Sequence, residues 1–76
     1  MPATEIVTAK RIEPHPEALI LVFDDRQVSI PWERCSRRLA EATIEQRLKA
    51  ELSPGGYGIH WPEIDEDLSI NGLLRA

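Results

Sequence analysis

Cysteine, histidine and aromatic residues are scarce in this sequence of 76 residues. It holds one cysteine, two histidines, two tryptophans, one tyrosine and one phenylalanine. Cys35 has no second cysteine for an internal disulfide, and with so few histidines it cannot build a zinc site. We therefore expect no metal and no cofactor, and a reducing cytoplasm is the simplest setting.

Long hydrophobic runs are missing as well. The longest run, residues 18–23, is far shorter than the ~20 apolar residues that a membrane-spanning helix needs. Residues 1–11 are polar and lack the apolar region of a secretory signal. The sequence therefore predicts a cytoplasmic protein without membrane contact.

The small size of the chain limits what it can do. A mass of 8.6 kDa allows one domain, residues 1–76. A deep active-site cavity would compete with the core for the same few apolar side chains. The small size therefore argues against an enzyme, and we expect no catalytic residues. It favours a protein partner or a homo-oligomer that covers exposed apolar surface.

Three strand-like segments separated by turns predict a β-meander in the first half. Residues 6–12 are rich in β-branched side chains, and Pro14 and Pro16 should end that strand. Residues 18–23 are apolar on both faces, which is typical of a central, doubly buried strand. A polar turn, 24–26, leads to a third strand, 27–30, with one buried face.

The second half predicts short helices and one further strand. Trp32, Cys35 and Leu39 share a helical face, which makes Cys35 a core residue. Thr43 and Gln46 form a capping-box pattern, so the helical region is two short helices or one helix broken near Ala42. A glycine-rich loop, 53–58, precedes a short fourth strand, 59–61; an acidic turn, 63–68, and a last helix capped by Ser69 follow. The fold class is α+β, a small antiparallel sheet packed with two or three short helices.

Basic and acidic residues are separated along the chain, whose net charge is −4. The middle carries the one basic patch, formed by Arg34, Arg37, Arg38, Arg47 and Lys49. Nucleic-acid binding through Arg34, Arg37 and Arg38 is an alternative hypothesis. Nearby glutamates and the acidic total favour a solvated helix face instead, and make nucleic-acid binding by this chain alone the weaker interpretation.

The acidic residues near the C-terminus lack the spacing of a metal-binding loop. Asp65, Glu66 and Asp67 are consecutive, whereas an EF-hand places its ligands at alternate positions over twelve residues. The three acidic residues indicate a solvated helix start. The alternative interpretation is a surface that binds a basic partner. Trp61 beside them should pack the strand end against the last helix, and its exposed remainder is our first candidate for a binding hot spot.

The histidines match no catalytic motif. His15 lies between two prolines, and His60 should face away from Ile59 and Trp61 on its strand. No nucleophile elbow and no zinc-protease motif accompanies either of them. A small enzyme that uses His60 and a carboxylate stays open as a further alternative.

The C-terminal half resembles a known family. Residues 55–74 read GGYGIHWPEIDEDLSINGLL, which is similar to the end of the bacterial domain of unknown function 2442. Three positions depart from the family pattern: Arg26 and Pro54 replace glycines, and Ala50 replaces an aromatic residue. The resemblance implies an α+β fold with an antiparallel sheet. It also implies a gene beside one for domain of unknown function 4160, in an arrangement like a toxin–antitoxin pair.

Our leading hypothesis is a non-enzymatic protein-interaction module, the antitoxin-like member of such a pair. Its partner would be the neighbouring domain of unknown function 4160 protein. The residues expected to meet that basic partner are His60, Trp61, Asp65, Glu66, Asp67, Leu73 and Leu74. Complementary charge would aid encounter, and Trp61 or the leucines would slow dissociation.

Overall fold

Six strands and four short helices make up residues 7–75, the part of the chain that the computed structural model describes. In chain order they are β1 (Arg11–Pro14), β2 (Ala18–Val22), β3 (Gln27–Pro31), α1 (Trp32–Cys35), α2 (Arg37–Ala40), α3 (Ile44–Leu48), β4 (Glu51–Leu52), β5 (Gly58–Trp61), β6 (Glu66–Ser69) and α4 (Ile70–Arg75). The α+β class expected from the sequence is confirmed.

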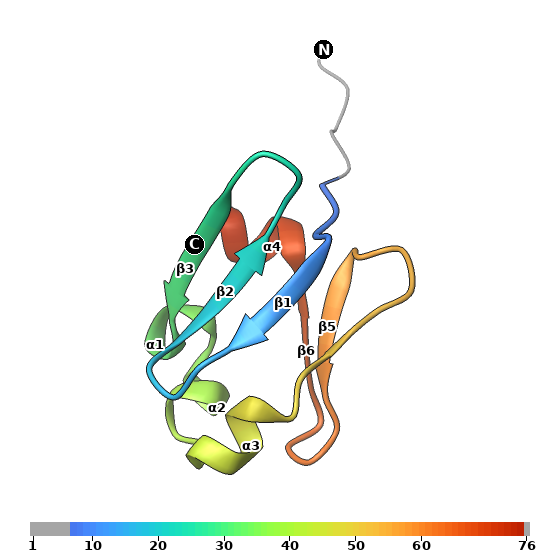
Figure 1. The fold of residues 1–76 in the computed structure, drawn as a ribbon. Coiled ribbons are helices and arrows are strands. Elements are labelled where there is room, and N and C mark those ends of the chain that lie inside the picture. Colours follow the sequence, from blue (N-terminus) through green and yellow to red (C-terminus); the bar gives the residue numbers. More distant parts are fainter. Residues whose placement is uncertain (1–6, 76) are drawn as a thin grey trace.

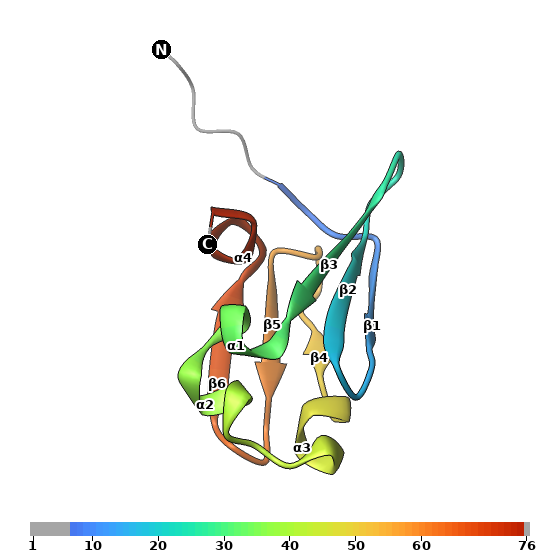
Figure 2. The same ribbon diagram turned by 90° about the vertical axis from the view of Figure 1, so that its left-hand side faces the viewer.

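The strands form two antiparallel sheets rather than one. The first has the order β1-β2-β3 and the second has the order β4-β5-β6. The strand expected at 59–61 is therefore the centre of a second sheet and not a fourth strand of the meander. Figure 2 shows the two sheets with α1, α2 and α4 along one side and α3 at one end.

The first sheet follows the predicted meander with a shifted first strand. β1 begins at Arg11 and ends at Pro14, whereas the sequence predicted 6–12; residue 6 lies outside the described part of the chain. Before β1, the Ala9 N–H donates to the carbonyl oxygen of Gly56 at 2.9 Å, so this segment is held by the loop before β5. β2 is central as predicted. Its second face is only partly covered, because Ile20 is half-buried.

The helices between the sheets are shorter than the sequence suggested. Ser36, with an extended backbone, separates α1 from α2, and its hydroxyl oxygen accepts the Leu39 N–H at 3.1 Å. The break near Ala42 and the capping box of Thr43 and Gln46 at the start of α3 are both confirmed. None of the helices within residues 7–75 is long and apolar enough to cross a membrane.

The core lies between the two sheets and is closed by the helices. Leu19 and Leu21 of β2 and Ile59 and Trp61 of β5 belong to one buried cluster. The other buried members are Ala9, Ile30, Trp32, Leu39, Ile70 and Leu73. Trp32 and Trp61 are its largest side chains, and both are inaccessible to solvent. The functional surface must therefore be sought outside this cluster.

Candidate functional site

The outer face of the second sheet carries a row of polar side chains. His60 lies on the central strand β5, opposite Glu51 of β4 and Asp67 of β6. Successive side chains of a strand alternate between its faces, so Ile59 and Trp61 point into the core and His60 points out. The sequence predicted this orientation of His60, and the structure confirms it.

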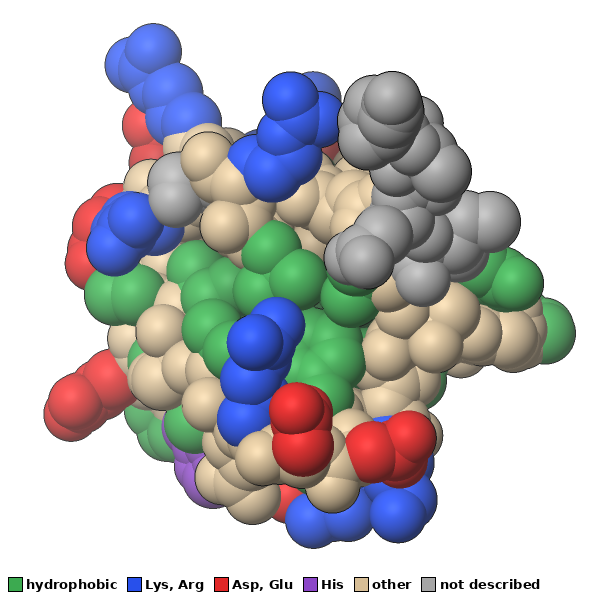
Figure 3. Space-filling model, turned by 90° about the horizontal axis from the view of Figure 1, so that it is seen from above, with side chains coloured by type: hydrophobic (Ala, Val, Ile, Leu, Met, Phe, Trp, Pro, Cys, Tyr) green, Lys and Arg blue, Asp and Glu red, His purple; other side chains and the backbone are tan. Residues whose placement is uncertain are grey.

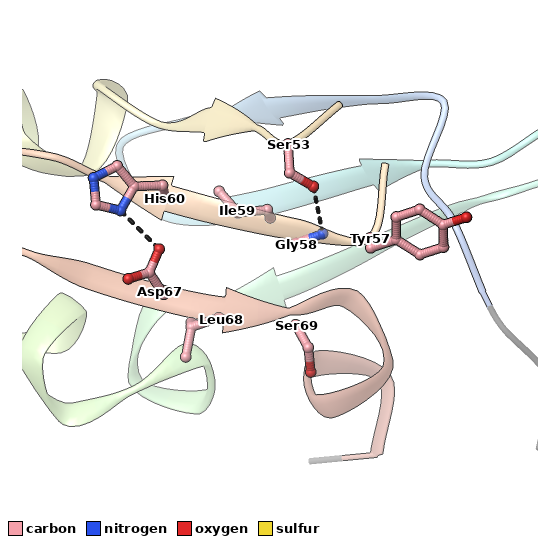
Figure 4. Close-up of a pocket in the computed structure, with 8 residues that line it drawn as sticks. All are labelled: Ser53, Tyr57, Gly58, Ile59, His60, Asp67, Leu68 and Ser69. Carbon is pink, nitrogen blue, oxygen red and sulfur yellow. Dashed lines mark hydrogen bonds and ion pairs between the residues drawn. The ribbon is translucent and has the colours of Figure 1, made fainter. Parts of the chain in front are cut away.

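His60 and Asp67 form a side-chain pair across β5 and β6. The His60 Nδ1 and the Asp67 Oδ1 are 2.7 Å apart, and both side chains keep contact with solvent. Directly opposite residues in an antiparallel pair bring their side chains close enough to interact. Figure 4 shows the two side chains pointing toward one another at one end of a pocket. This pairing fixes the imidazole orientation at the edge of that pocket.

An open pocket of about 370 Å³ lies along β5 and β6. Its lining residues are Ser53, Tyr57, Gly58, Ile59, His60, Asp67, Leu68 and Ser69. Gly58 lacks a side chain, and its neighbours across the strands, Ser53 and Ser69, are small. A Cβ atom added at Gly58 would lie 3.2 Å from the Leu68 carbonyl oxygen. The pocket therefore exists because this row of the sheet has almost no side-chain volume.

The two serine hydroxyls in the pocket already serve the backbone. The Ser53 Oγ accepts the Gly58 N–H at 3.0 Å, and the Ser69 Oγ accepts the Gly72 N–H at 2.9 Å. The second bond caps α4, as the sequence predicted. These hydroxyls hold the loop before β5 and the start of α4 in place.

Tyr57 is the most exposed large hydrophobic residue of the described chain. Its side chain stands at the opposite end of the pocket from His60 and is 53% exposed. Sequence reasoning counted Tyr57 only among the aromatic residues and assigned the loop 53–58 to turns. The sequence did carry a signal for the pocket. Gly58 and His60 are two residues apart on one strand and therefore share its outer face, so a position without a side chain lies there next to Tyr57.

The acidic segment is a turn followed by a strand. The sequence placed all of 63–68 in a turn, but Glu66 and Asp67 belong to β6 because they pair with Trp61 and His60. Asp65 takes a left-handed backbone conformation, with φ of 52°. Within the described residues, no group of three His, Cys, Asp or Glu side chains is placed to hold a metal ion.

The structure divides the partner surface that the sequence predicted. His60, Asp65, Glu66 and Asp67 remain together on the β5–β6 hairpin. Trp61 and Leu73 lie in the core, 0% and 4% exposed, so neither offers a surface to a partner. Leu74 is half-buried on α4 and lines a different hollow, beside β3. Tryptophan was expected to keep an exposed part, but a domain this small uses both of its indoles to fill the core.

The residues of the predicted basic patch make separate contacts. Arg37 pairs with Glu41 at 3.3 Å, and Arg38 donates to the carbonyl oxygen of Ile64 at 3.0 Å. Arg34 lines the hollow beside β3. Lys49 forms a 2.6 Å ion pair with Glu63, which raises the Lys49 pKa.

Arg47 acts as a structural residue. Its guanidinium donates to the carbonyl oxygens of Leu39, Ala40 and Pro16 at 2.9, 2.7 and 3.2 Å. It also lies over the ring of Trp32, 5.8 Å from the ring centroid. Sequence reasoning missed this role because the three carbonyl groups come together only in the folded chain.

Cys35 was predicted to be a core residue, but it is only half-buried and packs against the buried cluster from outside. Its Sγ lies 3.9 Å from the carbonyl oxygen of Ile30. Burial, with a smaller contribution from the charge of Glu33, raises the pKa of the thiol to about 11. A thiol of such high pKa is protonated at neutral pH and is a poor nucleophile.

Comparison with known proteins gives a family and a fold but no activity. No curated protein matches this chain. A crystal structure of a protein of unknown function from Rhodospirillum rubrum ATCC 11170 is similar, with a TM-score of 0.78 and 27% sequence identity. That similarity covers 90% of this chain and 84% of the other. The family model described as "Protein of unknown function (DUF2442)" matches residues 9–76, and this chain therefore belongs to that family.

Proposed function

We propose that the protein is a non-enzymatic interaction module that binds a basic segment of a protein partner along the pocket of β5 and β6. The observation that carries the proposal is the exposed Tyr57 ring at one end of an open pocket whose other end is Asp67. An aromatic residue with a polar tip supplies large contact area to a partner, and tyrosine is enriched at binding hot spots.

The charge of this region supports a basic partner. Residues 50–76 contain five acidic residues and one basic residue. Glu51 and Asp65 are exposed around the β5–β6 hairpin. Asp67 is exposed too, although it pairs with His60, and Glu63 is paired with Lys49. Complementary charge of this kind accelerates encounter and selects among partners. Burial of Tyr57 in the complex would then slow dissociation.

The resemblance to the family suggests which partner this is. In the arrangement that resembles a toxin–antitoxin pair, this chain is the antitoxin-like member, and the neighbouring domain of unknown function 4160 protein is the partner. The mechanism in that case is masking: the acidic hairpin covers a basic surface that the partner needs for its own activity.

The test is co-purification with the neighbouring gene product, followed by titration of purified proteins. Tyr57→Ala and Asp65→Lys/Asp67→Lys should each weaken binding at least about tenfold, as for a hot-spot residue. Glu17→Lys is the control for a charge reversal away from the pocket, because Glu17 is an exposed acid in the turn between β1 and β2. Binding that is equally strong in all four proteins would reject this surface.

One observation favours a second candidate function. Asp67 orients the His60 imidazole beside a pocket, and an imidazole held in this way can act as a general base. Turnover of chromogenic esters that is lost in His60→Gln and kept in His15→Gln would establish a small enzyme instead. Equal rates in both variants would leave the binding role as the explanation of the pocket.

A further inference from the structure

The pocket along β5 and β6 spans two rows of side chains on the outer face of the second sheet. Figure 1 shows these two strands side by side, on the far side of the molecule from β3. The row at the Tyr57 end consists of Ser53, Gly58 and Ser69. The row at the other end consists of Glu51, His60 and Asp67. The rows are two residues apart along each strand, which is a distance of about 7 Å.

Negative charge gathers at the His60 end of the pocket. Asp67 is the only acidic residue that lines the pocket, and no lysine or arginine lies among its lining residues. The Asp67 side chain is 73% exposed; its Oδ1 is bonded to the His60 Nδ1, and its Oδ2 has no donor within residues 7–75. Glu51 is exposed on the other side of His60. A cation that reaches this row therefore finds an acceptor oxygen and no competing basic side chain.

The Tyr57 end of the pocket is suited to hydrocarbon. None of the lining residues at this end is charged, and the row of Gly58 has almost no side-chain volume. The ring of Tyr57 stands beside this row and is 53% exposed. Apolar atoms that lie over Gly58 would cover part of the ring, and burial of apolar surface favours binding. The pocket thus joins an apolar end to an anionic end.

A second hollow, of about 120 Å³, lacks this separation of charge. It lies between β3 and α4 and is lined by Arg34 as well as by apolar residues such as Leu74. Figure 3 shows hydrophobic side chains gathered on the end of the molecule where the β2–β3 hairpin and α4 lie, with both basic and acidic side chains around them. Charge of both signs selects no class of partner there, whereas the lining of the pocket along β5 and β6 is acidic only.

We infer that the pocket receives one lysine side chain of the partner. This inference rests on the proposed function, because it names the residue through which the basic segment binds. The four methylene groups lie over Gly58 and against Tyr57, and the Nζ ammonium donates to the Asp67 Oδ2. Lysine buries its hydrocarbon stem in this way while its charged head stays in water. An extended lysine measures about 6 Å from Cα to Nζ, because its five bonds of about 1.5 Å form a zigzag, and this length matches the spacing of the two rows.

Arginine fits the carboxylate less well than lysine does. A guanidinium binds most strongly when two parallel hydrogen bonds reach both oxygens of a carboxylate. The Asp67 Oδ1 is already engaged by His60. An ammonium is a compact charge with rotatable donors, so a single oxygen is enough for it. A small diamine is also a poor fit, because no acidic residue lines the Tyr57 end for its second ammonium.

Titration of the ¹⁵N-labelled full chain with blocked amino acids tests this inference without the partner. The probe is N-acetyl-lysine methylamide, followed through the backbone amide signals of the pocket. A ligand of this size binds with a dissociation constant of about 1 mM, so the series extends to ~50 mM. We expect saturable shifts confined to residues of the pocket. N-acetyl-norleucine methylamide, which lacks the ammonium, should bind at least tenfold more weakly, and N-acetyl-arginine methylamide should also bind more weakly.

Substitutions locate the probe within the pocket. Asp67→Asn keeps an oxygen for the His60 Nδ1 but removes the charge, so it should weaken binding of the lysine probe at least about tenfold. Asp25→Asn is the matched control at an exposed carboxylate of the β2–β3 turn, and it should leave binding unchanged. Tyr57→Ala should weaken binding, whereas Tyr57→Phe keeps the ring and should not. The amide spectrum of each variant shows whether it is folded.

The inference is overturned if the native chain shows no saturable shift up to the end of the series. It is equally overturned by a norleucine or arginine probe that binds as tightly as the lysine probe, or by a folded Asp67→Asn variant that binds the lysine probe unchanged. The proposed function is decided separately by the titration with the partner, because a segment that binds through arginine would still be weakened by Tyr57→Ala and by the charge reversals. Unchanged partner binding in those variants rejects the proposed function, whatever the probes show.

Discussion

The indole rings of Trp32 and Trp61 meet edge to face in the centre of the core, with their centroids 6.2 Å apart and their planes at 80°. Each ring N–H has a backbone acceptor: Trp32 donates to the His15 carbonyl oxygen at 2.9 Å, and Trp61 donates to that of Arg47 at 3.2 Å. The pair therefore joins the β1–β2 turn, α1, the end of α3 and β5. A buried tryptophan whose N–H is hydrogen-bonded contributes a large buried apolar area and also a directional hydrogen bond that fixes the ring orientation.

Trp61→Ala should come close to unfolding the protein. Truncation of a buried aromatic residue costs about 3–5 kcal/mol, and a domain of this size has about 4–11 kcal/mol in total. Urea unfolding followed by circular dichroism measures the loss. Tyr57→Ala, at an exposed ring, should change the unfolding free energy by no more than about 0.5 kcal/mol. Similar losses in the two variants would contradict the assignment of Trp61 to the core and Tyr57 to the surface.

Arg47→Lys should destabilise the fold even though it conserves charge. The guanidinium reaches three carbonyl groups from a fixed plane, whereas the lysine ammonium is a compact charge that cannot match all of them. Loss of charged hydrogen bonds that are partly buried predicts a cost of about 1.5–3 kcal/mol.

Arg37→Lys is the matched control for this change. Its side chain is 91% exposed and pairs with Glu41 on the same side of the helix, so we expect a change of at most about 0.5 kcal/mol. Thermal unfolding of the two variants side by side measures the difference. Equal midpoints would mean that a lysine ammonium replaces the guanidinium of Arg47 without loss of stability.

Gly56→Ala should be more damaging than Gly55→Ala, although both glycines have positive φ. A Cβ at Gly56 would lie 2.3 Å from the backbone oxygen of Ala9, in a segment held by the bond from the Ala9 N–H to Gly56. At Gly55 the obstacle is the ring of Tyr57, which can rotate away. Left-handed backbone alone costs about 1–3 kcal/mol at either position.

The clash between a Cβ atom at position 56 and the Ala9 backbone should be visible in hydrogen exchange. We expect the Ala9 amide to lose protection in Gly56→Ala and to keep it in Gly55→Ala. Chemical denaturation gives the accompanying loss of stability. A protected Ala9 amide in both variants would show that the loop accommodates the new methyl group.

Local sequence signals predicted the parts of the fold that depend on neighbouring residues. The Thr43–Gln46 capping box and the Ser69 cap each need only a few adjacent positions, and both are present. The outward orientation of His60 follows from alternation along one strand. These features did not require knowledge of the tertiary structure.

Features that arise from long-range pairing were not predictable from the sequence. β4 has two residues and no pattern, and it becomes a strand only by pairing with β5. β6 includes Glu66 and Asp67, whose low strand propensity is overridden by the partner strand. The pocket, likewise, required knowing that Ser53 and Ser69 flank Gly58. Ser36 did carry a usable signal, because serine is a favoured N-cap residue and caps α2.

The raised pKa of Cys35 predicts how its reactivity depends on pH. Only the thiolate is alkylated, and burial holds the pKa at about 11 in the folded protein against an ordinary value of 9.0. The rate of reaction with iodoacetamide should therefore keep rising about tenfold per pH unit beyond pH 9, up to about pH 11. The same chain in urea, where burial is lost, should level off near pH 9. A folded protein whose rate already levels off near pH 9 would show that the thiol is accessible to water.

The same shift should make stability fall at high pH. Between about pH 9 and 11 the unfolded chain has lost the thiol proton and the folded chain has kept it, so rising pH favours unfolding. The contribution of Cys35 is intact below pH 9 and is lost as the pH passes through that window. Cys35→Ser removes the titrating thiol and leaves the lysines and the tyrosine unchanged. The native chain should therefore lose more unfolding free energy than Cys35→Ser between pH 8 and 11. Parallel curves of unfolding free energy against pH for the two proteins would show that the thiol is as well solvated in the folded chain as in the unfolded chain.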